Sequence, residues 1–318
     1  MSHLIETMAF VRDTPWHGLG NPLSAGSPID TWLTEAGMDW RIDHSDVLFN
    51  VAGDAGMHIR PHSDAKVLYR SDTLAPLSVV SNRYKVVQPA EVLHFYNDLV
   101  AAGGFELETA GVLKGGRKLW ALAKTGQEAL VKGGDNVKAY LLLATSCDGT
   151  LCTTAQFTSV RVVCNNTLQM AVNDSTGAVK VPHSTKFDPK AVKEALGIGL
   201  SSWDMFIGNI KQLSQRPVSL AEAVTYFGDV LEESVLDGAN TPASRAMQQV
   251  TALYSGAGMG SLLAGSRNTA WGLLNAMTEY VDHSRRARSQ DHRLDSAWFG
   301  AGAQLKQRAL DHALALLA

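Results

Sequence analysis

The order of apolar and polar positions along the chain predicts two parts of different character. Up to about residue 190, short apolar runs alternate with polar positions and are separated by glycine-containing turns, which is typical of β-strands. Beyond that point apolar residues recur three and four positions apart over long segments, which indicates helices. We therefore expect an α+β domain over residues 1–190, with an N-terminal arm, and an all-helical domain over residues 191–318.

The first part is predicted to run strand, strand, strand, helix and then hairpins. The apolar runs that predict the three strands are residues 46–53, 65–70 and 77–88. Pro89 suits the first turn of the helix, and Gly103 with Gly104 would end it. The pairs Gly115-Gly116 and Asp148-Gly149 are those that tight hairpin turns favour. The expected architecture is an antiparallel sheet with one packed helix.

Composition and charge narrow the class of protein. The chain has 318 residues and a net charge of −3, which excludes a uniformly basic nucleic-acid binder, so any basic surface must be local. Cys147, Cys152 and Cys164 are odd in number and lack the spacing of a metal site, which suits a reducing cytosol. No apolar run approaches the roughly 20 residues that span a bilayer, and the N-terminus does not resemble a signal peptide. We expect a cytoplasmic protein without a membrane partner.

The stretch SVRVVCNNTLQMAV, residues 159–172, begins as a strand. Arg161 alternates with Val160 and Val162, so its side chain is expected on the opposite face from theirs. On an open face Arg161 could contact a phosphate. On a covered face it would need a carboxylate partner, because an unpaired buried charge is costly. The sequence leaves both interpretations open.

The second half of this stretch is predicted to turn into a helix. Asn165 or Asn166 is a suitable N-cap for a helix over residues 167–172. Cys164 shares the apolar face of the preceding strand. We expect a small buried side chain there rather than a nucleophile, since no base can be placed beside it.

Basic and aromatic side chains on or beside the predicted strands are candidates for nucleic-acid contact. Proteins that bind single strands combine a cationic groove along the phosphates with aromatic platforms under the bases. The excess of positive charge is slight, with ten Lys or Arg and seven Asp or Glu between residues 66 and 138, so these side chains could equally be solvated strand faces. The candidate phosphate contacts are Arg161, Lys118, Arg117, Lys114, Arg83 and Lys85, and the candidate stacking groups are Tyr84 and Trp120.

Three further motifs have simpler interpretations. Trp16 and His17 predict an ordered N-terminal loop with an aromatic anchor, which docks on its own domain or on a neighbouring subunit. Glu279 and His283 share one helix face but lack the further ligands that a metal site needs. The segment HSRRARSQDHR, residues 283–293, is basic and could meet nucleic acid, an acidic neighbour, or only water at a helix end.

Several motifs occur together in a fixed order. They are PWHGLG at 15–20, SNRYKVVQP at 81–89, ATSCDG at 144–149, SVRVVCNNTL at 159–168, TAWGLLNAMTEYVDH at 269–283 and SAWFGAGAQLKQRAL at 296–310. In that order they resemble the phage/plasmid-like protein family, also called domain of unknown function 932. The resemblance covers nearly the whole chain. It implies an origin on a mobile element and a place in the cytoplasm of a bacterial host cell.

The predicted element order is also similar to the core of the Rad52-like single-strand annealing proteins, which travel on phages and plasmids. This analogy at the level of fold favours a single-stranded DNA binding or annealing protein that acts in homologous recombination or replication as a ring or filament of identical subunits. The first alternative is a non-enzymatic interaction protein that binds a host protein of a defence or replication complex. The second is a hydrolase or nuclease. Residue spacing assembles neither a carboxylate cluster nor a nucleophile with its base, so no catalytic residue, metal or cofactor is expected.

Overall fold

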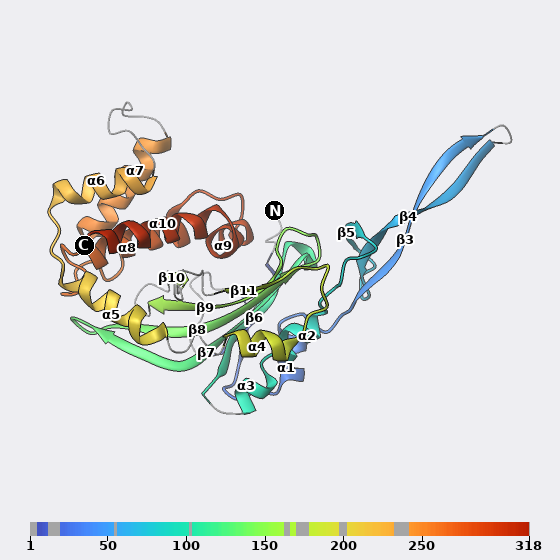
Figure 1. The fold of residues 1–318 in the computed structure, drawn as a ribbon, viewed down its shortest axis with the longest axis horizontal. Helices are drawn as coiled ribbons and strands as arrows, with labels where there is room; N and C mark the ends of the chain where they lie inside the picture. The colour runs from blue at the N-terminus through green and yellow to red at the C-terminus, as the bar shows by residue number, and fades with distance from the viewer. Residues whose placement is uncertain are drawn as a thin grey trace. The chain divides into compact units, whose positions relative to one another are not determined.

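The computed structural model describes residues 5–11, 20–53, 56–101, 104–161, 166–169, 178–196, 202–231 and 242–317. The architecture is mixed α+β, with sheets and short helices first and a mostly helical C-terminal part (Figure 1). This confirms the fold class that the change of apolar period predicts. In the described segments, no helix combines the length and the apolar character that crossing a membrane requires.

The chain forms two compact units that are interleaved in sequence. Unit 1 comprises Met1–Thr125, Leu141–Gln156 and Ala178–Leu196, and unit 2 comprises Gly126–Tyr140, Phe157–Gly177 and Gly197–Ala318. The main chain therefore passes from one unit to the other several times. The two units do not divide the chain at a single point. The domain boundary expected near residue 190 stays a prediction.

The larger sheet has the strand order β10-β9-β8-β7-β6-β1-β2, and β11 pairs with β9. Its strands are β1 (Ile5–Val11), β2 (Asn21–Leu23), β6 (Glu106–Leu113), β7 (Lys118–Val131), β8 (Asp135–Ser146), β9 (Thr153–Arg161), β10 (Asn166–Gln169) and β11 (Ala178–Val181). β7 starts with six consecutive buried residues, so both faces of the sheet are covered at that point. The single turn η1 (Lys114–Gly116) joins β6 to β7, and Gly115 and Gly116 have the positive φ angles that the turn requires.

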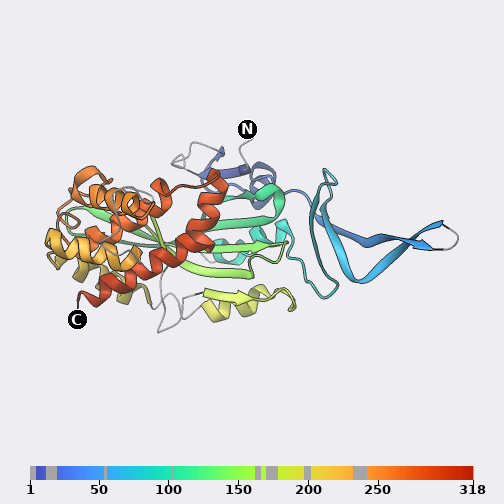
Figure 2. The same ribbon diagram turned by 90° about the horizontal axis from the view of Figure 1, so that it is seen from above.

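The smaller sheet consists of β3 (Ile42–Gly53), β4 (Gly56–Arg70) and β5 (Pro76–Ser81), all antiparallel. β5 pairs with β4 only from Ala65 onward, so the outer part of the β3–β4 hairpin has two strands. Neither view shows another described element of unit 1 beside this outer part (Figures 1 and 2).

Four short helices belong to unit 1. They are α1 (Ile29–Glu35), α2 (Pro89–His94), α3 (Asn97–Ala101) and α4 (Pro189–Leu196). Tyr96, in the turn between α2 and α3, is fully buried and donates its hydroxyl to Ala121 O at 2.8 Å and Leu141 O at 3.0 Å. Burial raises the pKa of this phenol. The side chain thus fixes the two helices to strands β7 and β8.

Unit 2 contains the longer helices. They are α5 (Ser202–Gln215), α6 (Leu220–Leu231), α7 (Pro242–Ala252), α8 (Ala270–Glu279), α9 (Gln290–Phe299) and α10 (Ala301–Ala315), with the π turns η3 (Leu253–Ala257) and η4 (Tyr280–Ser284). All ten residues of α8 are buried, which makes it the central helix of the unit. Trp271 of α8 donates its indole N–H to the buried Asp135 Oδ2 of β8 at 2.9 Å. α8 and α10 both pack against β10.

Two predicted elements differ from the structure. The helix expected over residues 167–172 is wrong for its described part, because Asn166–Gln169 form strand β10, paired antiparallel with β9. The single helix expected from Pro89 is divided into α2 and α3 by a turn at Phe95 and Tyr96. In both places a tertiary contact, strand pairing in the first and the buried Tyr96 in the second, outweighs local helix signals.

Candidate phosphate-binding site

The connection between α8 and α9 carries the densest group of cations in unit 2. Helix α8 continues into the π turn η4, which ends where Arg285 N donates to Tyr280 O at 2.7 Å. The chain then runs without helical structure to Ser289, whose hydroxyl caps α9 by accepting from His292 N at 3.3 Å. The arginines of the sequence Arg-Arg-Ala-Arg thus lie on a short connection between two helix ends.

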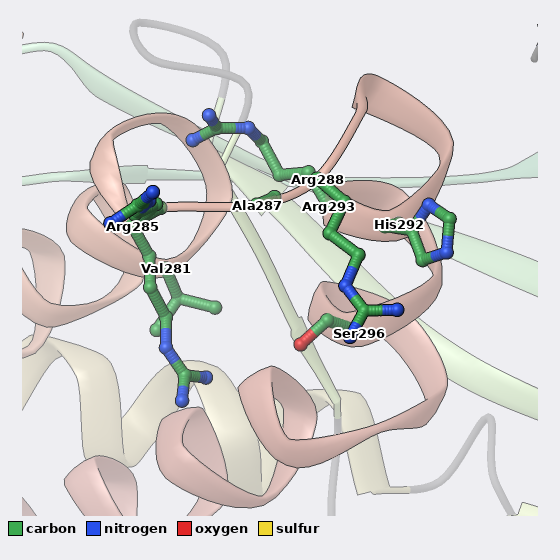
Figure 3. A pocket seen from close by; sticks show the side chains of 8 residues that line it. Val281, Arg285, Ala287, Arg288, His292, Arg293 and Ser296 are labelled. Carbon is green, nitrogen blue, oxygen red and sulfur yellow. The ribbon is translucent and has the colours of Figure 1, made fainter.

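These residues line a pocket of about 520 Å³. Figure 3 shows its lining side chains, which come from the end of α8, the connection and the first turns of α9. The lining residues are Val281, Arg285, Arg286, Ala287, Arg288, His292, Arg293 and Ser296. Among the described lining residues four are arginines and none is acidic, so the pocket favours an anion.

Two of the arginines have buried nitrogen atoms without a hydrogen-bond partner in the described structure. They are Nη1 of Arg285 and Nε of Arg293. A buried donor that lacks a partner costs roughly 1–3 kcal/mol, and more when it is charged. Burial also lowers the pKa of Arg293, although its Nη1 donates to His283 O. Both atoms are also closed off from solvent, so an anion in the pocket reaches them only after the side chains move.

The N-terminus of α9 adds to the positive potential. The first-turn N–H groups of a helix and its dipole attract anions, and α9 begins beside the pocket with Gln290. Ser289 Oγ also pairs with His292 Nδ1 at 2.8 Å, which orients the imidazole. Guanidinium groups form paired hydrogen bonds with phosphate oxygens, so the arrangement is suited to hold phosphate groups.

The residues predicted from sequence, apart from Arg161 of unit 2, lie in unit 1, in a different setting. Two separate segments, around Tyr84 and around Arg117, meet at the β8–β9 turn. Tyr84 donates its hydroxyl to Ser146 O at 2.9 Å, and Cys147 N donates to Arg117 O at 2.9 Å. The structure therefore brings together two groups of predicted contacts that are about thirty positions apart in the sequence.

Lys118 and Trp120, two of the predicted contacts, lie in the interior of unit 1. Their exposed fractions are 4% and 3%, because the start of β7 is covered on both faces. Lys118 acts electrostatically on Asp148: burial raises the pKa of Asp148, but hydrogen bonds from Thr150 and Ser146 and the positive charge of Lys118 bring it below the ordinary value. An oligonucleotide has no access to either side chain in this structure.

Tyr84 has a structural role that limits it as a stacking group. Its ring already stacks on His183, with centroids 4.3 Å apart and an interplanar angle of 17°. Burial also raises the pKa of its hydroxyl. His183 in turn places its ring nitrogens at 3.2 Å from Lys85 O and 2.9 Å from Leu151 O. The Tyr84–His183 pair thus holds the loop before α2 against the β8–β9 turn.

The remaining predicted contacts stay predictions. Arg83, Lys85 and Arg117 are exposed, and Lys114 is half-buried. Arg117 also donates its Nε to Leu77 O at 2.9 Å. Arg161 is the last residue of β9, opposite Asn166 of β10, but its side chain lies outside the described part of the structure.

The other motifs have structural explanations or fall outside the description. The Glu279 carboxylate accepts from Met259 N at 3.0 and 3.1 Å, which closes the turn after η3. Trp16, His17 and Cys164 lie outside the described residues. Within the described residues no group of three His, Cys, Asp or Glu side chains could hold a metal ion.

The arginine pocket is a candidate site that the sequence alone does not identify. The basic segment 283–293 is visible in the sequence, but its interpretation as a solvated helix end is equally consistent with the pattern. Only the fold shows that Arg285 and Arg293 have buried donors and that no acidic side chain is among the described lining residues.

A comparison with protein families finds a match to the Domain of unknown function (DUF932) over residues 76–298. The matched region includes the whole arginine pocket and the exposed side chains of Arg83, Lys85 and Arg117 in unit 1. Neither a curated protein nor a solved structure matches the chain.

Proposed function

We propose that this chain, which belongs to the DUF932 family, is a nucleic-acid-binding protein that holds the phosphates of single-stranded DNA in the arginine pocket. The observation that carries the proposal is a pocket that is lined by four arginines and has no acidic side chain among its described lining residues. Guanidinium groups that line a pocket donate charge-assisted hydrogen bonds to phosphate oxygens, which are strong acceptors.

The shape of the site favours a single strand over a duplex. A pocket of about 520 Å³ is concave and larger than one phosphate group needs. A flexible single strand can place successive phosphates in such a site, whereas a duplex is stiff over about 150 base pairs and presents a convex backbone. A strand held by its phosphates keeps its bases available for pairing with a complement. The wider role that we propose is therefore strand annealing in recombination or replication of a phage or plasmid.

The binding test compares two charge reversals of equal size. We expect Arg286→Glu with Arg288→Glu to weaken binding of an oligothymidylate at least about tenfold. The slope of log binding constant against log salt concentration should become less steep by about one for each phosphate that is no longer bound. Both side chains are exposed, so the fold should tolerate the change. The matched control, Arg83→Glu with Lys85→Glu, alters net charge equally on exposed residues of unit 1. Fluorescence anisotropy between about 50 and about 200 mM salt measures both.

The results of these measurements test the identity of the ligand and the location of its binding site separately. Absent or salt-insensitive binding of the wild-type protein would refute the proposed function. If the control pair abolishes binding and the pocket pair does not, then the strand binds the predicted contacts of unit 1 and the assignment to the pocket is wrong. If thymidine monophosphate competes as strongly as the oligonucleotide at equal phosphate concentration, then the ligand is a small phosphorylated molecule rather than a strand.

A further inference from the structure

The outer part of the β3–β4 hairpin exposes apolar side chains on both of its faces. We define the outer hairpin as residues 47–53 and 56–62. Five large apolar side chains on it are between 40% and 68% exposed: Leu48, Phe49, Val51, Met57 and Ile59. Two strands alone are marginally stable in water, and monomeric proteins rarely leave a contiguous apolar surface of this kind uncovered.

The register divides these side chains between two different faces. On one face the cross-strand pairs are Leu48 with Pro61, Asn50 with Ile59, and Ala52 with Met57. This set is called the apolar face, because it contains no charged side chain. On the other face the pairs are Val47 with His62, Phe49 with Arg60, and Val51 with His58. This set is called the mixed face, because an apolar row lies beside a row with an arginine and two histidines.

The two faces also differ in exposure. Leu48, Met57 and Ile59 of the apolar face are 60%, 67% and 68% exposed. Phe49 and Val51 of the mixed face are 45% and 40% exposed, and the Phe49 ring lies edge-on to His62 with centroids 6.5 Å apart. The mixed face is therefore partly covered by its own side chains and is compatible with water. The apolar face is the one that needs a partner.

We propose that the apolar face of the outer hairpin packs against the same face of a second copy of this chain, forming a homodimer. The lack of charged side chains on the apolar face favours a second copy of the chain as the partner. A face without charged side chains is matched by an equally uncharged face, whereas a nucleic acid or an acidic protein would require a row of cations there. A twofold axis gives such self-complementary contact, since the same patch serves both subunits.

The size of the face sets the strength of the dimer. Specific interfaces need roughly 600 Å² from each partner at the lower end of the observed range. Seven residues of antiparallel strand extend about 24 Å, and a ribbon two strands wide of that length has a footprint of roughly 230 Å², which is less than half of that area. We expect a dimer that dissociates on dilution rather than an obligate one.

Asn50 would set the register of the dimer. It is the one polar residue among the six of the apolar face, and a buried amide needs a hydrogen-bond partner. Packing that brings it against the same residue of the second copy satisfies both amides. A single buried Asn fixes register in this way in coiled coils. The geometry thus favours a twofold axis close to Asn50.

The test uses the full chain and two matched lysine substitutions. Ile59→Lys adds a charge to the apolar face, and Val51→Lys adds the same charge to the mixed face of the same hairpin. Sedimentation equilibrium over a wide concentration range should show a wild-type dimer, an Ile59→Lys monomer and a Val51→Lys dimer. Unchanged far-UV circular dichroism would show that both variants fold.

A second variant tests the axis directly. Asn50→Cys in a Cys152→Ser background, which removes an exposed native thiol, should form a covalent dimer on mild oxidation. A wild-type protein that is monomeric at all concentrations would overturn the proposal. A dimer that Val51→Lys disrupts and Ile59→Lys does not would overturn it too. This inference is independent of DNA binding, since both measurements are made without nucleic acid.

Discussion

Among single residues, Glu222 is a carboxylate whose hydrogen bonds should make the stability of the protein depend on pH. It accepts hydrogen bonds from Ser219 N at 2.9 Å and Ser219 Oγ at 2.8 Å, and it pairs with Arg216 Nη2 at 2.8 Å. These bonds lower its pKa from 4.5 to about 2. The arrangement is a capping box at the start of α6, with the serine as N-cap and the glutamate three residues later.

We expect Glu222→Gln to reduce stability above pH 4.5 and to have a shrinking effect as the pH falls toward 2. The folded state holds the ionised carboxylate more strongly than the unfolded state does, so its contribution is present above the unfolded pKa and is lost on acidification. Urea unfolding at a series of pH values measures the difference from wild type. Glu194→Gln, an exposed carboxylate of α4, controls for net charge. An equal effect of both substitutions would contradict the role of the cap.

The buried ion pair of Lys306 and Asp282 gives a second prediction about single residues. The two side chains are 4% and 7% exposed, with Nζ and Oδ1 2.8 Å apart, and burial lowers the pKa of the lysine. Asp282→Asn leaves a buried ammonium without its counter-charge and should cost about 3–5 kcal/mol. Replacing both residues by apolar ones of similar volume should cost much less. Chemical unfolding of both variants tests this, and equal destabilisation by the two would contradict it.

Residue chemistry is only partly predictable from the sequence. The arginines of 285–293 are visible as a basic string, but the buried donors of Arg285 and Arg293 depend on how α8 and α9 pack. The sequence places Lys118 on a strand face, and alternation alone does not show that the sheet is covered on both sides at that strand. Sequence reveals which groups can bind, and the fold decides which of them remain accessible.

At the scale of elements, the all-buried helix α8 leaves no room for added atoms. A Cβ on Gly272 would overlap Ser266 O and lie 3.2 Å from the Tyr254 ring. We expect Gly272→Ala to destabilise the protein by about 3 kcal/mol or more, because backbone atoms would have to move. Thermal and chemical unfolding measure the change in stability.

Gly208 in α5 provides the matched control. A Cβ there meets nothing within 4 Å. Gly208→Ala should therefore stabilise the protein by up to about 1 kcal/mol, since alanine loses less backbone entropy in a helix. If both substitutions destabilise equally, then the overlap with Ser266 is not the cause.

Element types are predictable where one period dominates a long segment. Helices α5, α6, α7, α8 and α10 lie within the segments with helical spacing, and the turns at Gly115 and Gly149 have the expected positive φ angles. At strand β10 the sequence predicts a helix, because its asparagines match an N-cap. The observed conformation is set by pairing with β9, which the local sequence does not encode.

For the whole molecule, the interleaving of the two units determines whether fragments of the chain can fold separately. The segments Gly126–Tyr140 and Phe157–Gly177 belong to the same unit as the late helices. Val137, Leu168 and Leu274 line a common small cavity with Trp271, whose indole bonds to Asp135. The apolar surface of the helices is therefore completed by strands that precede residue 190.

We expect that neither fragment 1–190 nor fragment 191–318 folds fully on its own, because each lacks part of the core of unit 2. Each should lack a cooperative thermal transition and bind a hydrophobic dye such as ANS, while coexpression of both should restore a cooperative transition. As a control, replacing residues 47–62 by two glycines should leave the melting temperature of the full chain nearly unchanged at a protein concentration where the chain is monomeric, since most of the described side chains there are exposed. A fragment 191–318 that melts cooperatively would contradict the shared core and would establish the boundary near residue 190 that the sequence predicts.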